Sequence, residues 1–166
     1  MFGFGRKKTG AAAPAADAAR IDSPARGRIL PLAEVPDPVF SGGLVGPGFA
    51  VDLEEGEVRA PVAGTVVMIP DTLHAVGIRA AGGAEVLVHV GVDSVTLKGE
   101  GFTARCAVGD RVEAGQVLIE LDLGLLRERI PSTITPVVVS NADGYEVEGP
   151  MLEAPGGRGV LLVRPR

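Results

Sequence analysis

The chain carries two histidines, His74 and His89, and both lie in the stretch 71–102. A neutral imidazole is a nucleophile near pH 7, because its unperturbed pKa is about 6.5. Two such rings on one face could carry a phosphoryl group, with one ring bonded to phosphorus and the other donating a hydrogen bond to the phosphoryl oxygens. Thr72, two residues before His74, would fix the tautomer of that ring. The spacing leaves open which ring accepts the group.

Two predicted strands must bring these rings together. Valines alternate with other residues over 85–93, which is the period of a half-buried strand, and 72–78 predicts a strand before it. A four-residue turn at 80–83 places His74 opposite His89, with Cβ atoms about 5 Å apart, and a two-residue turn keeps both on one face. A three-residue turn would put them on opposite faces, so the pair requires an even turn.

The composition predicts an all-β fold, a sandwich or barrel. Hydrophobic residues make up 46% of the chain and aromatic residues 4%, so the core must be aliphatic. The 24 Gly and 13 Pro fall between short β-branched runs, as in sandwiches and barrels. The single helical signal covers 122–130, which begins at the capping residue Asp122 and stops before Pro131. The net charge of −5 and the lack of a basic patch argue against nucleic acid and favour a basic protein partner.

The chain divides into a leader and one domain. Residues 1–22 are rich in alanine and lack strand periodicity, which predicts a disordered leader before a folded domain at 23–166. The aromatic and basic residues of 2–8 allow at most a peripheral contact with an anionic membrane surface. No apolar run reaches the ~18 residues of a membrane span. The single cysteine, Cys106, cannot form an internal disulfide, so we expect a cytoplasmic protein.

A zinc site is one alternative to phosphoryl chemistry. His74, His89 and Asp93 would supply three ligands, enough for an open catalytic zinc. The H-x-x-x-D spacing of His89 and Asp93 resembles zinc peptidases of the lysostaphin type. Those enzymes also need an H-x-H motif, and this chain has no third histidine. A zinc-binding hydrolase thus remains a competing hypothesis that lacks one of its required motifs.

A cofactor-carrier module is a second alternative. The segments 60–69 and 108–122 resemble the two halves of biotinyl and lipoyl carrier domains. Such domains carry their cofactor on a lysine in a hairpin soon after the second half. Here 123–130 follows and contains no lysine, so the residue that this hypothesis needs is missing.

Six motifs carry a resemblance to a known family. They are VPDPVFSGGLVGPGFAV (35–51), APVAGTV (60–66), HAVGI (74–78), EVLVHVGVDSVTLKGEGF (85–102), VGDRVEAGQ (108–116) and TPVVVSN (135–141). In this order they are similar to the glucose-class enzyme IIA domain of the bacterial phosphoenolpyruvate:sugar phosphotransferase system. The resemblance covers almost all of 23–141 and is weaker beyond Asp143. Ser94 stands where this family usually has threonine, a change that removes no reacting group.

The resemblance implies an antiparallel β-sandwich of the duplicated hybrid-motif type and a phosphotransferase component that takes part in sugar uptake. It implies that His89 accepts a phosphoryl group at Nε2 from the phosphocarrier protein HPr and donates it to a cysteine of an enzyme IIB domain. His74 would hydrogen-bond the phosphoryl group, and Thr72 would position His74. No cofactor is obligatory, although His74 and His89 would bind zinc together with a partner's carboxylate in a regulatory complex.

The resemblance also implies a docking surface for proteins. Asp37 and Asp93 match acidic positions that face the basic surface of HPr. The apolar rim around the pocket would consist of Val39, Phe40, Leu44, Val45 and Val76. The chain shows no IIB or IIC region, so we expect it to act on separate IIB/IIC permease partners, which choose the sugar, and on regulatory proteins. Gly91 beside the nucleophile would leave room for a partner's backbone or phosphate.

Overall fold

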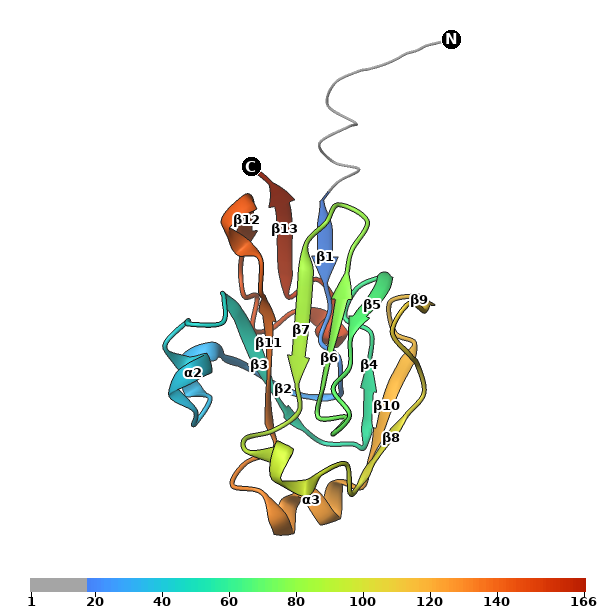
Figure 1. Ribbon diagram of the computed structural model, residues 1–166. Coiled ribbons are helices and arrows are strands. Elements are labelled where there is room, and N and C mark those ends of the chain that lie inside the picture. Colours follow the sequence, from blue (N-terminus) through green and yellow to red (C-terminus); the bar gives the residue numbers. More distant parts are fainter. Residues whose placement is uncertain (1–17) are drawn as a thin grey trace.

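Antiparallel strands make up every sheet of the computed structural model, which describes residues 18–166 (Figure 1). The largest sheet has seven strands in the spatial order β2-β3-β11-β7-β6-β5-β9. These strands are β2 (Gly27–Pro31), β3 (Gly48–Leu53), β5 (Gly64–Met68), β6 (Ala75–Arg79), β7 (Glu85–His89), β9 (Arg111–Val112) and β11 (Ile134–Val139). β6, which begins one residue after His74, and β7, which ends at His89, are interior strands with a neighbour on each side.

Two three-stranded sheets and a few short helices complete the fold. One sheet joins β4 (Glu57–Arg59), β10 (Val117–Leu121) and β8 (Phe102–Ala104), and the other joins β1 (Ala19–Ile21), β13 (Leu161–Pro165) and β12 (Tyr145–Glu148). The helical segments are α2 (Pro38–Ser41), α3 (Leu123–Arg129), η2 (Leu32–Glu34), η3 (Ser94–Leu97), η4 (Ala142–Gly144) and η5 (Pro155–Gly157). The predicted all-β class with only short helices is confirmed. No helix among residues 18–166 has both the length and the apolar character needed to cross a membrane.

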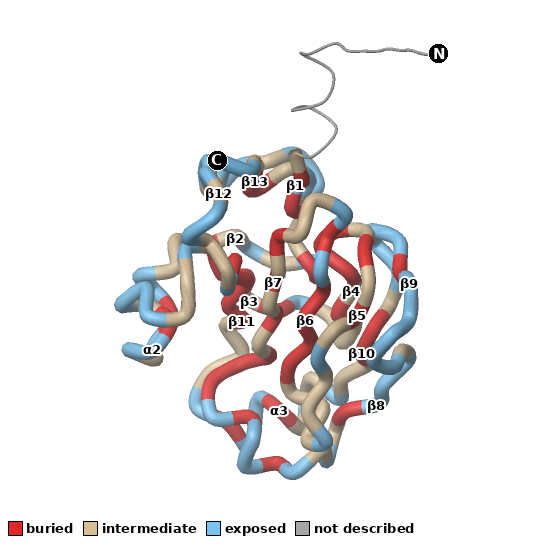
Figure 2. The backbone as a smooth tube through the Cα atoms, turned by 45° about the horizontal axis from the view of Figure 1, so that its top comes forward, coloured by how far each residue is buried: buried red, intermediate tan, exposed pale blue. Residues whose placement is uncertain are grey.

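The core consists mainly of aliphatic side chains. One cluster of buried residues draws on all three sheets. Figure 2 shows the buried residues along β3, β6 and β11 and the exposed ones along the outer loops. Val51, Val88 and Val137 are completely buried, and each such side chain stabilises the fold by about 1.5–3 kcal/mol relative to an exposed one.

The folded part begins earlier than the predicted boundary at residue 22. Ala19–Ile21 form β1, which pairs with Leu161–Val163 of β13, and Ile21 is fully buried. A strand of three residues is too short to give a readable alternation in the sequence, so the prediction that the leader extends to residue 22 is wrong. Residues 1–17, including the predicted membrane-contact segment, lie outside the described residues.

The one predicted helix is present as α3. The Asp122 carboxylate accepts a hydrogen bond from the Leu125 amide at 3.1 Å, which caps the first turn. The helix ends at Arg129, and Pro131 follows directly after the capping residue. Because α3 follows β10 where a biotinyl or lipoyl carrier needs a lysine-bearing hairpin, the carrier hypothesis has no support in the fold.

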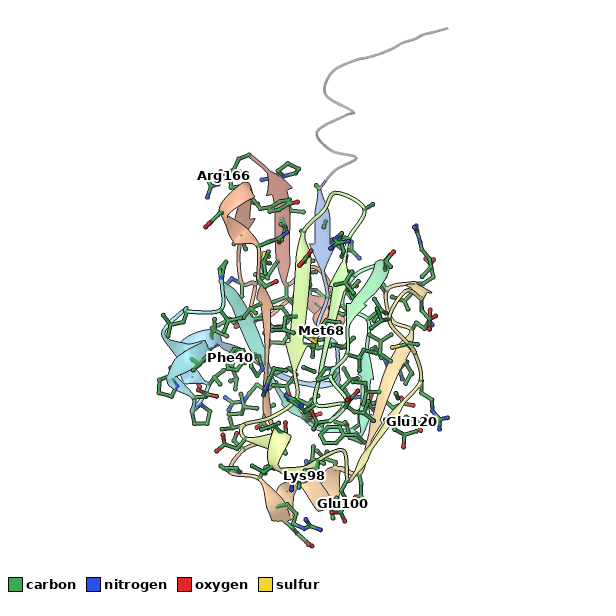
Figure 3. The ribbon with its side chains drawn as sticks, viewed as in Figure 1. Phe40, Met68, Lys98, Glu100, Glu120 and Arg166 are labelled. Carbon is green, nitrogen blue, oxygen red and sulfur yellow. The ribbon has the colours of Figure 1, made fainter. Side chains whose placement is uncertain are left out.

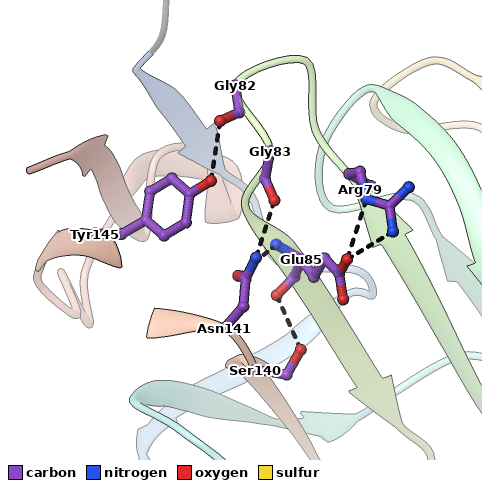
Figure 4. A network of polar contacts seen from close by, with 7 residues as sticks. All are labelled: Arg79, Gly82, Gly83, Glu85, Ser140, Asn141 and Tyr145. Atoms are coloured by element: carbon purple, nitrogen blue, oxygen red, sulfur yellow. Dashed lines mark hydrogen bonds and ion pairs between the residues drawn. The ribbon is translucent and has the colours of Figure 1, made fainter. Parts of the chain in front are cut away.

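A polar network fixes the turn between β6 and β7 (Figure 4). The Asn141 side chain accepts a hydrogen bond from the Glu85 amide at 2.8 Å and donates one to the Gly83 carbonyl at 3.0 Å. The Tyr145 hydroxyl donates to the Gly82 carbonyl at 3.0 Å. The turn is thus held by residues at and beyond the end of β11, at the end of the hairpin that is remote from the histidines.

The turn that this network holds has three residues, not an even number. The Ala80 amide bonds the Ala84 carbonyl at 2.9 Å, which leaves 81–83 as the turn. As a result Ala75, and not His74, lies opposite His89. Within the turn, Gly83 takes a φ of 95°, which suits the last position of a three-residue hairpin turn. The predicted strand pairing of the two histidines is therefore wrong.

Candidate functional site

The two imidazole rings nevertheless meet. Their centroids lie 5.0 Å apart, and the ring planes cross at 78°, edge to face. β6 begins only at Ala75, and Leu73 takes a left-handed φ of 60°, so the chain leaves the extended conformation just before His74. The His74 carbonyl still accepts a hydrogen bond from the Val90 amide at 2.8 Å. A break in the strand, rather than an even turn, places His74 beside His89.

His89 has a defined tautomer. Its Nδ1 lies 3.0 Å from the Gly91 carbonyl oxygen. A carbonyl can only accept a hydrogen bond, so Nδ1 carries the proton and the neutral ring keeps its lone pair on Nε2. Nε2 of His89 is therefore the candidate nucleophilic atom.

The His74 ring has a partner that can donate a hydrogen bond. Its Nδ1 lies 2.6 Å from the Thr72 hydroxyl oxygen. When the hydroxyl donates to Nδ1, the proton of the neutral His74 ring sits on Nε2. The two rings then offer complementary functions, an electron pair on His89 and an N–H donor on His74.

Burial keeps both rings neutral at neutral pH. Desolvation lowers the pKa of His89 below its ordinary value of 6.5, and it outweighs the hydrogen bond to Gly91 and the nearby carboxylates of Asp37 and Asp93, which raise it. Desolvation also lowers the pKa of His74, and repulsion from His89 when that ring is protonated lowers it further. A neutral His89 retains the lone pair on Nε2.

α2 forms one wall of the site. The Asp37 carboxylate caps it by accepting a hydrogen bond from the Val39 amide at 3.0 Å, and Pro38 occupies its first position. This Asp-Pro pair is a helix-start signal that could have revealed α2 in the sequence. The helix places the buried ring of Phe40, labelled in Figure 3, with its centroid 5.0 Å from that of His89. Phe40 therefore packs beside His89 and is not part of an exposed rim.

Two predicted rim positions are strongly exposed. Val39 is 47% exposed and Leu44 is 80% exposed, while Val45 is half-buried. Val95, which follows the histidine strand in η3, is 48% exposed. Sequence reasoning missed Val95, although an apolar residue in a polar loop two positions after Asp93 was its signal.

Val76 does not belong to the rim. Its side chain is 0% exposed, and it pairs with Val88 on the core face of the sheet. The one-residue difference in register turns Val76 inward, because side chains alternate between the two faces of a strand. The prediction that Val76 contacts a partner is wrong.

The described residues offer no three-ligand metal site. No group of three or more His, Cys, Asp or Glu side chains within residues 18–166 is arranged to hold a metal ion. Asp93 is exposed, with a left-handed φ of 60°, and it acts on His89 through its charge. The zinc-hydrolase hypothesis, which needs Asp93 as the third ligand, has no support in this geometry.

Comparison with known proteins identifies the family. Residues 19–145 match the family described as "phosphoenolpyruvate-dependent sugar phosphotransferase system, EIIA 1". A glucose-specific EIIA component of Halalkalibacterium halodurans is 46% identical over 148 residues, which cover 89% of this chain and 84% of that protein. A beta-glucoside-specific EIIBCA component of Bacillus subtilis is 47% identical over 125 residues, which cover 75% of this chain and 20% of that protein.

A solved structure shows the same fold. Glucose permease IIA from Mycoplasma capricolum superposes with a TM-score of 0.80 at 33% identity, covering 87% of this chain and 95% of that one. The chain therefore belongs to the enzyme IIA family of the phosphoenolpyruvate-dependent sugar phosphotransferase system. It is a phosphocarrier, a transferase component of sugar transport with the antiparallel β-sandwich fold of its family. These comparisons confirm the family, fold and function predicted from the sequence.

Proposed function

We propose that His89 is the phosphoryl acceptor and that it reacts through Nε2. The observation that supports this assignment is the Nδ1 bond to the Gly91 carbonyl, which leaves the lone pair on Nε2. The neutral ring attacks the phosphorus of phospho-HPr, so that a new N–P bond forms while the bond between phosphorus and the donor breaks. No proton has to be removed from His89 for this step.

His74 stabilises the group that His89 carries. Its Nε2–H donates to a phosphoryl oxygen, and Thr72 sets this tautomer through the contact at Nδ1. A hydrogen bond to a charged oxygen contributes roughly 1.5–3 kcal/mol. In the second step a thiolate of an enzyme IIB domain attacks the same phosphorus, the S–P bond forms, and the His89 lone pair is restored. A IIB region is fused to the related domain in the Bacillus subtilis relative.

The surface around the histidines suits transient protein partners. Exposed apolar side chains of Val39, Leu44 and Val95 lie on the segments that flank the site, and Asp37 and Asp93 add negative charge close to His89. A basic partner such as HPr would be steered to such a face. These partners act in the cytoplasm, which is where the proposal places the chain.

The two imidazoles also fit a metal held between proteins. They supply two nitrogen ligands, and a tetrahedral zinc needs further ligands. A partner's carboxylate would complete such a site in a regulatory complex, as the resemblance implies. The histidines would then be withdrawn from phosphoryl transfer.

Phosphorylation in vitro tests the acceptor. The chain is incubated with phosphoenolpyruvate, enzyme I and HPr, and its intact mass is measured before and after acid treatment. We expect one acid-labile phosphoryl group, absent from His89→Ala and present in His74→Gln. A phosphoryl group on His89→Ala, or none on the unsubstituted chain, would overturn the assignment.

A further inference from the structure

Two buried hydroxyls contact the backbone of the residues that follow His89. Ser94 and Thr135 are both 0% exposed, and within residues 18–166 they are the only polar side chains among the buried residues. Burying a hydroxyl costs free energy unless it is hydrogen-bonded. Each hydroxyl makes one hydrogen bond to the chain segment that directly follows His89.

The two hydroxyls hold the two ends of one peptide group. The Ser94 hydroxyl donates to the carbonyl of Val90. The Gly91 amide, which belongs to the same peptide group, donates to the Thr135 hydroxyl at 3.2 Å. Thr135 donates its own proton to the Thr133 carbonyl at 3.1 Å, so its oxygen accepts from Gly91. Because a peptide group is planar, fixing both ends fixes its orientation.

The next peptide group is held in the same way and contains the acceptor for His89. The Gly91 carbonyl accepts from His89 Nδ1, and the Val92 amide donates to the Ser132 carbonyl at 2.9 Å. The two groups meet at Gly91, where φ is 66°. Because glycine has no side chain, its backbone dihedral angles are little restricted. The direction of the Gly91 carbonyl therefore depends on the hydrogen bonds that hold the neighbouring peptide group.

The space at Gly91 is filled from inside the protein. A Cβ added there would lie 2.6 Å from Ile130 Cδ1 and 2.8 Å from the Ser132 carbonyl oxygen. Gly91 is buried, so the expectation that it leaves room for a partner is wrong. The packing requires glycine here and leaves the direction of the carbonyl to the hydrogen bonds around it.

We propose that Thr135, together with Ser94, is a positioning residue for the phosphoryl acceptor. The two hydroxyls clamp the peptide group between Val90 and Gly91, and this clamp directs the Gly91 carbonyl at His89 Nδ1. The carbonyl in turn keeps the proton off Nε2. This inference rests on the proposed role of His89 and adds two residues of the sheet and loop interior that do not touch the phosphoryl group.

Substitution of Thr135 tests the clamp. Thr135→Val keeps the shape of the side chain and removes the oxygen, while Thr135→Ser keeps the oxygen. We expect the valine variant to accept the phosphoryl group about tenfold more slowly at saturating phospho-HPr, the scale of one lost hydrogen bond. We expect serine to restore the rate to within about threefold.

A spectroscopic readout separates positioning from stability. Nitrogen-15 NMR of the imidazole above its pKa reports which ring nitrogen of His89 is protonated. We expect Nδ1–H in the unsubstituted chain and a larger share of Nε2–H in Thr135→Val. Val163→Ala, which opens space in the separate sheet of β13, lowers stability without touching this segment and should leave the tautomer unchanged.

Ser94→Ala acts on the other end of the same peptide group and provides a second test where Thr135→Val folds poorly. The double variant should be little slower than either single variant, because both break one clamp. The inference is overturned when Thr135→Val and Ser94→Ala show the same His89 tautomer and the same acceptance rate as Val163→Ala. The tautomer is read without phosphorylation, so failure of the clamp and failure of His89 as acceptor give different results.

Discussion

The hydroxyl of Thr72 lies 2.6 Å from Nδ1 of His74, whereas Nδ1 of His89 lies 3.0 Å from a backbone carbonyl. One ring is therefore held by a group that can donate, and the other by a group that can only accept. The same chemical unit acquires two roles from its neighbour at Nδ1. This asymmetry, and not the ring chemistry itself, distinguishes the proposed hydrogen-bond donor, His74, from the proposed phosphoryl acceptor, His89.

Thr72→Val should weaken the role of His74 while leaving His89 reactive. Without the hydroxyl, the His74 ring loses its fixed tautomer, and we expect transfer to the IIB domain to slow about three- to tenfold. Rapid-quench measurement of phosphoryl transfer checks this. Thr65→Val, on β5, removes a hydroxyl away from the histidines and should change neither step. An equal effect of both variants would contradict the proposed role of Thr72.

His74→Gln should separate acceptance from donation. Glutamine can donate a hydrogen bond to the phosphoryl oxygens, but it cannot carry a proton charge. We expect acceptance from phospho-HPr to persist and donation to the IIB domain to fall by at least about tenfold. The reverse pattern, with acceptance blocked in His74→Gln and retained in His89→Gln, would exchange the roles of the two histidines.

Negative charge close to His89 should raise the association rate with HPr. Asp37→Asn retains a residue able to cap α2, and Asp93→Asn suits the left-handed backbone, so both remove charge with little structural change. We expect each to lower the association rate about two- to fivefold at low salt and much less at high salt. Asp143→Asn in η4 makes the same change of net charge elsewhere. The prediction fails where Asp143→Asn slows association as strongly as the other two.

Phosphoryl acceptance should persist into mildly acidic solution. The pKa of His89 is lowered below 6.5 by burial, so the neutral ring remains the main form as pH falls through 6.5. We expect the acidic limb of the single-turnover rate to have its midpoint below 6.5, and the NMR titration of His89 to share that midpoint. The same lowered pKa makes folding stability depend on pH, because the folded state favours the neutral His89 ring. The contribution of the neutral ring to folding stability is complete above pH 6.5 and is lost as the pH falls from 6.5 toward the folded-state pKa. A midpoint at or above 6.5 would contradict the effect of burial.

The turn network should support stability rather than chemistry. Asn141→Ala removes the partners of the Glu85 amide and the Gly83 carbonyl. We expect a loss of about 1–3 kcal/mol in the free energy of unfolding, measured by urea denaturation, with His89 still phosphorylated in the folded fraction. Ser140→Ala, which removes only a 3.4 Å contact to the Glu85 carbonyl, is the matched control. Equal stability of the two variants would show that the network does not hold the hairpin.

Periodicity in the sequence located the strands, but it could not set their register. The alternation over β7 and the caps of α3 are local signals, and both features are present. The register depends on one residue of turn length, and an error of one residue moved His74 and Val76 to the wrong faces together. The His74 ring still meets His89 because Leu73 adopts a left-handed conformation, which a leucine gives no reason to expect.

The remaining differences arise from tertiary contacts. Ala19–Ile21 gain their strand conformation only by pairing with β13, about 140 residues away in the sequence. Ser94 and Thr135 looked like ordinary hydroxyl residues, and their importance appears only when the fold brings both to one peptide group. The histidine pair could be found because both of its members are chemically conspicuous and share one hairpin.

The position of β1 beside β13 gives the molecule two unlike poles. Both ends of the described chain emerge at one pole, near the turn of the β6–β7 hairpin, while the far end of β7 carries His89 toward α3 (Figure 1). A dye, a surface anchor or a fused domain attached after Arg166 would lie at the pole opposite the proposed phosphoryl acceptor. Attachment at this end would therefore leave the histidine pole accessible to protein partners in solution.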